Sequence, residues 1–260
     1  RGAGDAFMAM ISLWVANLLN IILDPLLIFG IGPFPELGAT GAAVATSIGR
    51  GVGVAFQLYI LFRGSRVIKI AWQHIQFIPS IFQKMINIAS TGFAQYFIAS
   101  ASWIFLARLV AEFGTDVYAG YFYAVRIILF TFLPAWGVSN AVATLVGQNL
   151  GAKQPDRAAT SVWRAAFYNM LFLLSISIGF FFFAEPLIRI FTDEPKAVEA
   201  GILSLRIFSA GYIFFAYGMI LGQAFGGAGD TRTPTIVNLI CFWAVEIPLA
   251  YFLSKSLGWG

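Results

Sequence analysis

Long apolar stretches separated by short polar segments run through the whole chain of 260 residues. A helix needs roughly 20 mostly apolar residues to cross a hydrocarbon core of about 30 Å. Near-unbroken apolar runs also argue against the alternating strands of a membrane barrel. The pattern therefore predicts an all-α, polytopic transmembrane helical bundle of about seven spans. We expect these spans at residues 8–30, 41–62, 83–111, 116–147, 159–184, 198–225 and 234–254.

Basic residues gather in alternate connections between these stretches. One set of connections holds Arg1, Arg63, Arg66, Lys69, Lys84, Lys153, Arg157, Arg164 and Arg232. The opposite set holds only Arg189, Lys196 and Lys255. Because cytoplasmic loops are enriched in Lys and Arg, we expect loops 63–82, 148–158 and 226–233 to face the cytoplasm. The predicted location is the plasma (inner) membrane, with the lipid bilayer as the surrounding solvent.

Composition narrows the function classes. The chain is 59% hydrophobic and 11% charged, whereas soluble domains carry roughly 25% charged residues. The net charge of +4 is spread over short loops, so it does not form the basic face of a nucleic-acid binder. A lone Cys241 and a lone His74 offer neither a disulfide framework nor a metal site. Without a catalytic cluster, we expect no enzyme activity, no metal and no cofactor.

A short motif occurs twice. Gly2-Ala3-Gly4-Asp5 recurs as Gly227-Ala228-Gly229-Asp230, and each copy precedes an apolar stretch on the predicted cytoplasmic side. About twenty residues later, one copy has Asp24-Pro25 and the other has Glu246 two residues before Pro248. Copies on the same side of the membrane predict a parallel internal repeat, an arrangement found in transporters.

The repeated motif has a structural interpretation. Glycine tolerates positive φ, so Gly4 and Gly229 permit a tight turn at the membrane edge. Asp5 and Asp230 can then cap the helix that follows. We interpret these four positions as structural loop residues.

Longer segments resemble the MATE (multidrug and toxic compound extrusion) transporters. The sequence Asn20-Ile-Ile-Leu-Asp-Pro-Leu-Leu-Ile-Phe-Gly30, followed by Leu37-Gly-Ala-Thr-Gly-Ala-Ala-Val-Ala-Thr46, resembles the fifth and sixth helices of that family. Residues 227–234 resemble the loop before its eleventh helix. Residues 147–152, Gly-Gln-Asn-Leu-Gly-Ala, are similar to the loop between its eighth and ninth helices. There Gly147, Gln148 and Gly151 are expected to end one helix and turn the chain toward the next.

The resemblance implies a twelve-helix transporter built from two six-helix bundles, of which this chain supplies the fifth to the eleventh helices. Residues 1–62 would end the first bundle and residues 63–82 would be the cytoplasmic linker. Residues 83–260 would supply five helices of the second bundle. The implied function is a secondary active antiporter that exports amphipathic or cationic organic compounds in exchange for a cation. We expect it to act as a monomer.

The polar residues of the first two spans are the candidates for ion coupling. Asn20 and Asp24 are four residues apart and therefore share one face of a helix. The resemblance to proton-coupled members implies a buried polar network of Asn20, Asp24 and Thr46, whose central partner is an acid in the family's first helix. Desolvation favours the neutral form of a carboxyl, so a buried Asp can exchange protons near neutrality. Protonation would then bias helix packing between outward-open and inward-open states.

The coupling ion is expected to be H⁺ rather than Na⁺. Members that resemble the sodium-coupled branch carry acids within helices seven and ten. The spans 83–111 and 198–225 offer only Glu199, at the edge of the second of these spans. This departure from the family pattern weakens the case for a sodium site of that type.

Three polar residues of the later spans are possible substrate contacts: Gln95, Arg126 and Glu246. An ionisable residue inside a membrane marks either a functional site or a paired structural one. The sequence leaves both interpretations open for Glu246. It is either a structural partner for an arginine such as Arg126 or a coupling residue. Two alternatives remain for the whole chain, a lipid-linked precursor flippase of similar architecture and a seven-helix receptor-like membrane protein.

Overall fold

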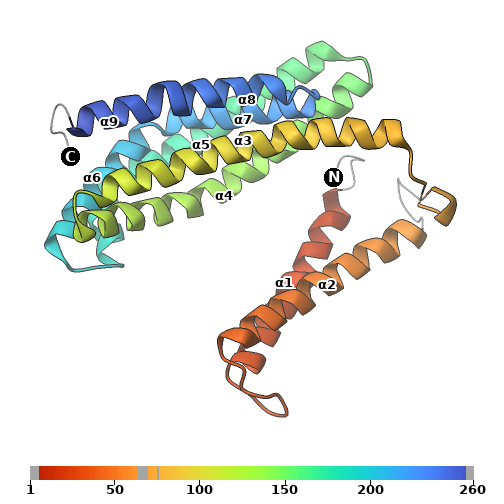
Figure 1. Ribbon diagram of the computed structural model, residues 1–260, viewed down its shortest axis with the longest axis horizontal. Helices are drawn as coiled ribbons and strands as arrows, with labels where there is room; N and C mark the ends of the chain where they lie inside the picture. Colours follow the sequence, from red (N-terminus) through yellow and green to blue (C-terminus); the bar gives the residue numbers. More distant parts are fainter. Residues whose placement is uncertain (1–5, 64–69, 75, 256–260) are drawn as a thin grey trace. The chain divides into compact units, whose positions relative to one another are not determined.

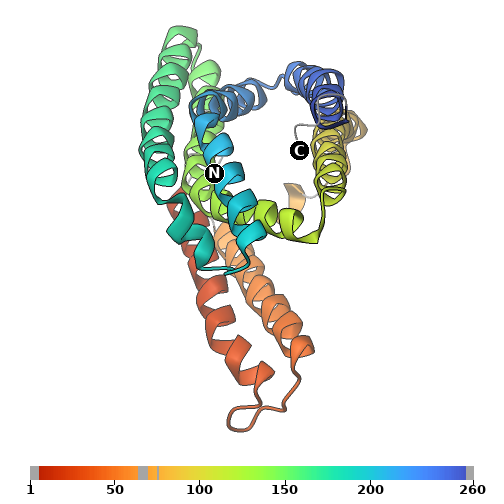
Figure 2. The same cartoon turned by 90° about the vertical axis from the view of Figure 1, so that its left-hand side faces the viewer.

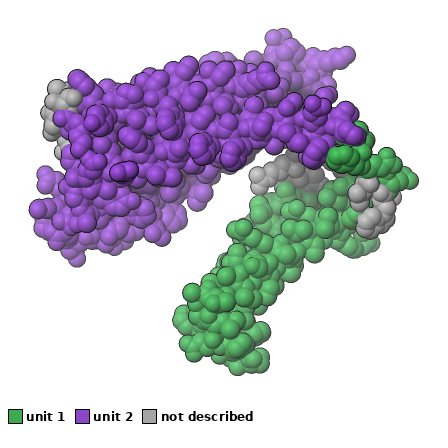
Figure 3. All heavy atoms as spheres, in the orientation of Figure 1, with its two compact units in different colours: residues 1–78 green, residues 79–260 purple. Residues whose placement is uncertain are grey.

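The computed structural model describes residues 6–63, 70–74 and 76–255. These residues form helices and contain no strand, which confirms the all-α expectation. The chain divides into two compact units, residues 1–78 and residues 79–260 (Figure 3). The elements in order are α1 (Ala6–Ile28), α2 (Ala39–Arg63), the 3₁₀ turn η1 (Trp72–His74), α3 (Pro79–Ala111), α4 (Thr115–Gly151), α5 (Pro155–Arg189), α6 (Pro195–Ala210), α7 (Tyr212–Gly227), α8 (Arg232–Asn238), the π-helical η2 (Leu239–Glu246) and α9 (Ile247–Lys255).

Six helical segments are long and apolar enough to cross a membrane, and the bent pair α6–α7 makes up to seven. The expected span at 198–225 is therefore not one straight helix. It breaks at Gly211, and its two halves are bent by 55°. A glycine has low helix propensity and no Cβ, so a bend is accommodated there with little steric cost.

The last span also departs from a regular helix. Its middle, η2, has π-type hydrogen bonding and is followed by Pro248 in α9. Proline has no N–H to donate and its ring clashes with the carbonyl four residues earlier. A local widening of the helix before proline relieves that clash, and such π segments occur often at functional sites.

The first unit is a pair of helices, α1 and α2, lying side by side (Figure 1). The face of α2 that meets α1 has small residues at every fourth position: Gly41, Ala45, Gly49 and Gly53. A Cβ on Gly41 would lie only 2.3 Å from the carbonyl oxygen of Leu27. Only glycine fits at such a distance, so the small residues allow the two backbones to approach closely.

In the second unit, α4 packs against α5, α6 and α7. The core between these helices includes the fully buried side chains of Leu173, Ile188, Leu205 and Tyr212. Outside this core, large apolar side chains such as that of Phe214, 81% exposed, cover the helices. An apolar exterior of this extent is the surface expected of a protein that faces lipid.

Helix α3 lies beside the last span, α8–η2–α9 (Figure 2). Three polar contacts join them at three levels. The Thr91 and Thr231 hydroxyls are 2.5 Å apart, and the Trp243 indole N–H donates to the carbonyl of Ile98 at 3.2 Å. At the far end, the Lys255 ammonium forms an ion pair with the Glu112 carboxylate. These contacts bind α3 and the last span into one pair along their length.

Candidate functional site

A polar network joins the two helices of the first unit. Helix α1 places Asn20 and Asp24 one turn apart, and α2 brings Thr46 against them. The Asn20 Nδ2 group donates to Asp24 Oδ1 at 3.2 Å and to Thr46 Oγ1 at 3.2 Å. All three side chains are partly buried. The structure therefore brings together the three residues that the sequence singled out.

Gly49 sets the spacing at this network. A Cβ at that position would lie 2.7 Å from the Ala16 carbonyl oxygen and 3.6 Å from the Asn20 Cβ. A side chain there would push α1 away from α2. Because Thr46 lies one turn before Gly49 on α2, the absence of a side chain lets Asn20 reach the Thr46 hydroxyl.

Sequence reasoning missed a second polar contact between α1 and α2. Buried Ser12 donates its hydroxyl to the Gly53 carbonyl at 3.1 Å, and the Gln57 side-chain amide donates to Ser12 Oγ at 2.8 Å. Ser12 lies two helical turns before Asn20, so it shares the same face of α1. This spacing from Asn20 is the signal in the sequence that could have identified Ser12. The Ser12 contacts extend the row of polar residues along the interface between α1 and α2.

The second unit contains a cavity of about 990 Å³, at the upper end of the range typical of small-molecule pockets. Five elements, α3, α4, α6, α7 and η2, contribute its walls. The lining is predominantly apolar and aromatic. It consists of Tyr96, Ala99, Ser102, Trp103, Leu106, Val125, Arg126, Ile128, Leu129, Phe130, Phe132, Leu133, Trp136, Ile207, Phe208, Gly211, Tyr212, Phe215, Met219, Phe242 and Glu246.

Aromatic rings in one wall are held in fixed positions. Phe132 and Phe215 are stacked, with ring centroids 4.5 Å apart and planes 4° apart. Tyr212 packs beside Phe132 with the ring centroids 5.2 Å apart, and its hydroxyl lies 2.9 Å from Thr131 Oγ1. Tyr212 follows the break at Gly211, so the bend of α6–α7 turns this ring into the wall. No pattern in the sequence indicates that role for Tyr212.

Two of the three polar residues predicted as possible substrate contacts line this cavity. Arg126 enters from α4 and Glu246 from the end of η2, whereas Gln95 precedes the lining residue Tyr96 and is not itself part of the lining. Among the described residues, the salt bridges are Arg189–Glu185 and Lys255–Glu112. The pairing of Arg126 with Glu246 that the sequence left open is therefore not formed in the structure.

One lining residue has an unsatisfied polar atom. The Ser102 side chain on α3 is only 2% exposed, and its hydroxyl has no hydrogen-bond partner in the described part of the chain. Buried polar atoms are nearly always hydrogen-bonded, so such an exception in a cavity wall calls for an explanation. The oxygen itself is covered, so it does not open into the cavity that other atoms of Ser102 line.

The loop between α7 and α8 adopts the turn expected of its motif. Gly229 has φ +84°. Asp230 Oδ1 accepts from the backbone N–H groups of Arg232 and Thr233, each at 3.1 Å, and Oδ2 accepts from the Thr233 hydroxyl. The hydrogen bond from the Thr233 hydroxyl, followed by that from its backbone N–H, lowers the pKa of Asp230 below its ordinary value. Asp230 thus accepts hydrogen bonds at the start of α8, while Gly4 and Asp5 of the other copy lie outside the described residues.

The motif at residues 147–152 ends α4 in a different way from that expected. Helix α4 does end at Gly151, and the Gln148 carbonyl accepts from the N–H of Ala152. The left-handed residue of the turn, however, is Lys153 at φ +57° rather than a glycine. Gly147 serves a packing role, since its Cβ would lie 3.3 Å from the Gly227 carbonyl oxygen. The two loop motifs thus meet where α4 and α7 cross.

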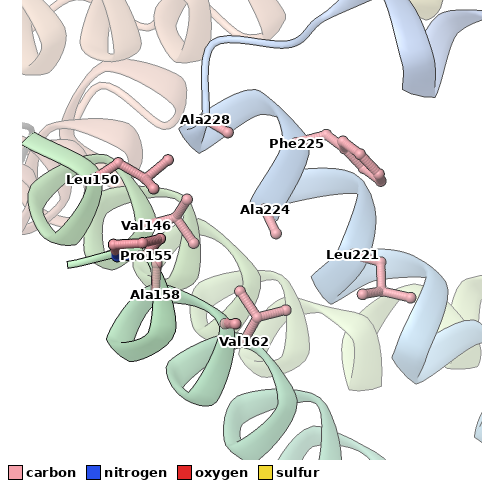
Figure 4. Close-up of a pocket in the computed structure, with 10 residues that line it drawn as sticks. Val146, Leu150, Pro155, Ala158, Val162, Leu221, Ala224, Phe225 and Ala228 are labelled. Atoms are coloured by element: carbon pink, nitrogen blue, oxygen red, sulfur yellow. The ribbon is translucent and has the colours of Figure 1, made fainter. Parts of the chain in front are cut away.

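A smaller hollow of about 280 Å³ lies beside these motifs (Figure 4). Its walls come from α4, α5 and the end of α7, and the side chains that line it are all apolar. They are Val146, Leu150, Pro155, Ala158, Ala159, Val162, Leu221, Ala224, Phe225 and Ala228. Without a charged or hydrogen-bonding side chain, this hollow has no group that could orient a ligand. The larger cavity is the better candidate site.

The fold and the two sites define a polytopic α-helical membrane protein with a polar network between one helix pair and a large aromatic cavity in a second helical unit. The chain belongs to the MatE family, whose sequence profile matches residues 88–252.

Curated relatives match almost the whole chain. A probable multidrug resistance protein NorM of Thermotoga maritima is 32% identical over 258 residues, covering 98% of this chain and 55% of the relative. A FAD transporter of Shewanella oneidensis is 26% identical, covering 96% of this chain and 55% of the relative. The chain thus spans about half the length of the curated relatives that it matches.

Solved structures show the same fold. A crystal structure of MATE in the bent conformation has a TM-score of 0.86 at 22% identity, and the match covers 97% of this chain and 55% of that one. A transporter of the MOP superfamily from Pyrococcus furiosus has a TM-score of 0.88 at 19% identity, covering 99% and 57%. Family membership sets aside the seven-helix receptor alternative. The names of the curated relatives do not favour the flippase alternative either.

Proposed function

We propose that this chain is part of a secondary active antiporter that exports amphipathic or cationic organic compounds in exchange for H⁺. The whole protein has twelve helices in two bundles. Residues 1–62 end the first bundle, residues 63–82 are the linker on the cytoplasmic side, and residues 83–260 form most of the second bundle. The chain's membership of the MatE family and the names of its relatives support transport as the activity.

The hydrogen-bond network of Asn20, Asp24 and Thr46 is the observation that carries the coupling proposal. Asn20 donates to a carboxylate oxygen and to a hydroxyl. A hydrogen bond to a charged acceptor is stronger than one to a neutral acceptor, so protonation of Asp24 weakens its bond to Asn20. The amide then favours Thr46, and the helix packing that goes with each arrangement changes in population.

The cavity of the second unit supports an organic substrate. Its volume suits a drug-sized molecule, and its apolar and aromatic lining suits the ring systems of amphipathic compounds. Phe215 stacks on Phe132 through one face and is 46% exposed, so its other face can attract an organic cation through its π electrons.

The coupling role is tested by Asp24→Asn in the full-length protein, reconstituted in vesicles with an imposed pH gradient. The variant keeps the size of the side chain and removes its ability to ionise. We expect normal membrane insertion and loss of proton-driven dye efflux. The matched control is Asp116→Asn, at an exposed position in the first turn of α4, which should transport at the wild-type rate. Undiminished efflux by Asp24→Asn would exclude Asp24 as the coupling residue.

A further inference from the structure

The Ser12 and Asn20 contacts lie at different levels of one pair of facing rows. Each row holds residues about one helical turn apart. The row on α1 is Ser12, Ala16, Asn20 and Asp24, and the row on α2, which runs in the opposite direction, is Gln57, Gly53, Gly49 and Thr46. Ser12 contacts Gly53 and Gln57 at one end. Asn20 contacts Thr46 toward the other end, about 12 Å from Ser12 along α1.

The small residues between these contacts fix the distance between the helices but not their register. Gly49 and Gly53 face Ala16, and a Cβ on either glycine would lie within 3.2 Å of an Ala16 atom. Apolar contacts are non-directional, so they tolerate a slide of one helix along the other. A hydrogen bond does not, because its strength depends on distance and angle. The register therefore depends on the polar contacts.

Asn20 leaves little tolerance for such a slide. Its Nδ2 group donates to Asp24 and to Thr46 at 3.2 Å each, which is the long end of the usual range for an N–H···O bond. One residue of register is about 1.5 Å along a helix. A shift of that size is enough to break the bond to Thr46. Asn20 therefore needs the register to be held elsewhere in the interface.

Ser12 meets this requirement. Its side chain is 1% exposed, and its hydroxyl is used twice. It donates to the Gly53 carbonyl at 3.1 Å and accepts from the Gln57 amide at 2.8 Å. Breaking either bond costs free energy, because a buried polar group loses its partner. Neither Ser12 nor Gln57 carries an ionisable group, so their contact stays the same when Asp24 gains or loses a proton.

We propose that Ser12 and Gln57 are positioning residues for the proton-coupling network, because they fix the register in which Asn20 reaches both Asp24 and Thr46. The inference rests on the proposed function and adds two residues to it. Ser12 lies roughly 18 Å from Asp24 along α1, so it acts on that carboxyl only through Asn20.

The charged residues around this helix pair do not take over that role. The cations of α1 and α2 are Arg50 and Arg63, and the connecting loop carries Glu36; all three are exposed. None of them forms a salt bridge with a described residue. The hydrogen bond from Asn20 is therefore the polar contact through which the register of the helix pair reaches Asp24.

The test follows the Asp24 carboxyl by infrared spectroscopy of the purified full-length protein in detergent. Its protonated-carboxyl band is the one that Asp24→Asn removes, and the midpoint is the pH at which this band is half-developed. Ser12→Ala should move the midpoint by about half to one pH unit, the equivalent of one hydrogen bond, in the same direction as Asn20→Ala. The two substitutions combined should move it no further than Asn20→Ala alone, because no amide is then left to misplace.

Ser47→Ala is the matched control. Ser47 is an exposed residue of α2 next to Thr46, and its hydroxyl donates to Ala43 of its own helix. This variant should keep the wild-type midpoint. If Ser12→Ala lowers the unfolding temperature and leaves the midpoint unmoved, Ser12 is only structural and the proposal is overturned. Additive shifts in the combined variant would also overturn it, because Ser12 would then act without Asn20.

Gln57→Met covers the case in which Ser12→Ala does not fold. Gln57 is exposed, and its replacement leaves the bond from Ser12 to Gly53 in place. The midpoint should move in the same direction by a smaller amount, and an unmoved midpoint would then refute the positioning role.

Vesicle efflux separates this proposal from that of antiport. If Asp24→Asn transports at the wild-type rate while the midpoint follows Ser12, the coupling role alone fails. If Asp24→Asn abolishes efflux while the midpoint does not respond to Ser12, the positioning role alone fails.

Discussion

Asp24 and Glu246 occupy corresponding places in the internal repeat, each shortly before a proline, yet their surroundings differ. Asp24 accepts a hydrogen bond from Asn20 at a tight interface between two helices. Glu246 ends a π-helical segment and lines a cavity without an ion pair to any described residue. A partnered acid is suited to switching hydrogen bonds between helices, while an acid open to a cavity is suited to meeting a ligand. The packing around each acid, more than its place in the repeat, therefore distinguishes the two positions.

The largest expected effect comes from separating the helices around Asp24. Gly49→Ala places a methyl group 2.7 Å from the Ala16 carbonyl oxygen, so the helices must shift, which should lower the free energy of unfolding by about 1–3 kcal/mol. Proton-driven transport should fall with it, because Asn20 moves away from Thr46. Thermal unfolding in detergent measures the first effect and vesicle efflux the second.

Gly51→Ala in the same helix is the matched control. A Cβ at Gly51 meets nothing within 4 Å, and replacing glycine by alanine inside a helix stabilises it by about 0.5–1 kcal/mol. If both variants unfold at the same temperature, the close approach of α1 and α2 at Gly49 is refuted.

The contrast between the two acids can be measured directly with double-mutant cycles. Asn20→Ala combined with Thr46→Val should show a coupling energy of about 1 kcal/mol in unfolding experiments, since the two side chains share a hydrogen bond. Arg126→Gln combined with Glu246→Gln should show coupling near zero in the absence of ligand. A strong coupling in the second cycle would mean that Glu246 is a paired structural acid, and the comparison would fail.

A smaller effect is expected from the aromatic wall. Phe215→Leu removes the ring that stacks on Phe132 and keeps an apolar side chain. Binding of an aromatic probe to the full-length protein should weaken about two- to tenfold, the range of a lost ring–ring interaction. Phe182→Leu, at a position 71% exposed and outside the cavity lining, should leave that affinity unchanged. Equal weakening by both variants would argue against a ligand face at Phe215.

Much of the fold could be predicted because membrane spans are defined locally by length and apolarity. The spans of α1 to α5 follow from hydropathy alone. The break at Gly211 does not, because Gly218 and Gly222 lie within the intact helix α7. What distinguishes Gly211 is the buried Tyr212 beside it, a feature of tertiary packing. The π segment before Pro248 depends on hydrogen-bond register, which hydropathy does not report.

The candidate sites were predictable to different degrees. Spacing placed Asn20 and Asp24 on one face, whereas Thr46 was reached only through the family resemblance. Ser102 gave no signal, because a serine in an apolar span is common and only the assembled cavity shows its hydroxyl to be unsatisfied. The local sequence pattern thus identified residues that share one helix. Contacts between different helices could be identified only from the structure.

The smallest effect concerns a third acid, Asp230, which precedes the last span and accepts hydrogen bonds from the first turn of α8. Its folded-state pKa is lowered, mainly by the Thr233 hydroxyl and backbone N–H. A lowered pKa contributes stability that is present above the unfolded value and is lost as the pH falls through the folded value. Wild type should therefore lose part of its thermal stability toward acid, and Asp230→Asn, which has no carboxyl to titrate, should lose less. Parallel pH profiles would show that the carboxylate adds no stability, leaving Gly229 alone to shape this turn.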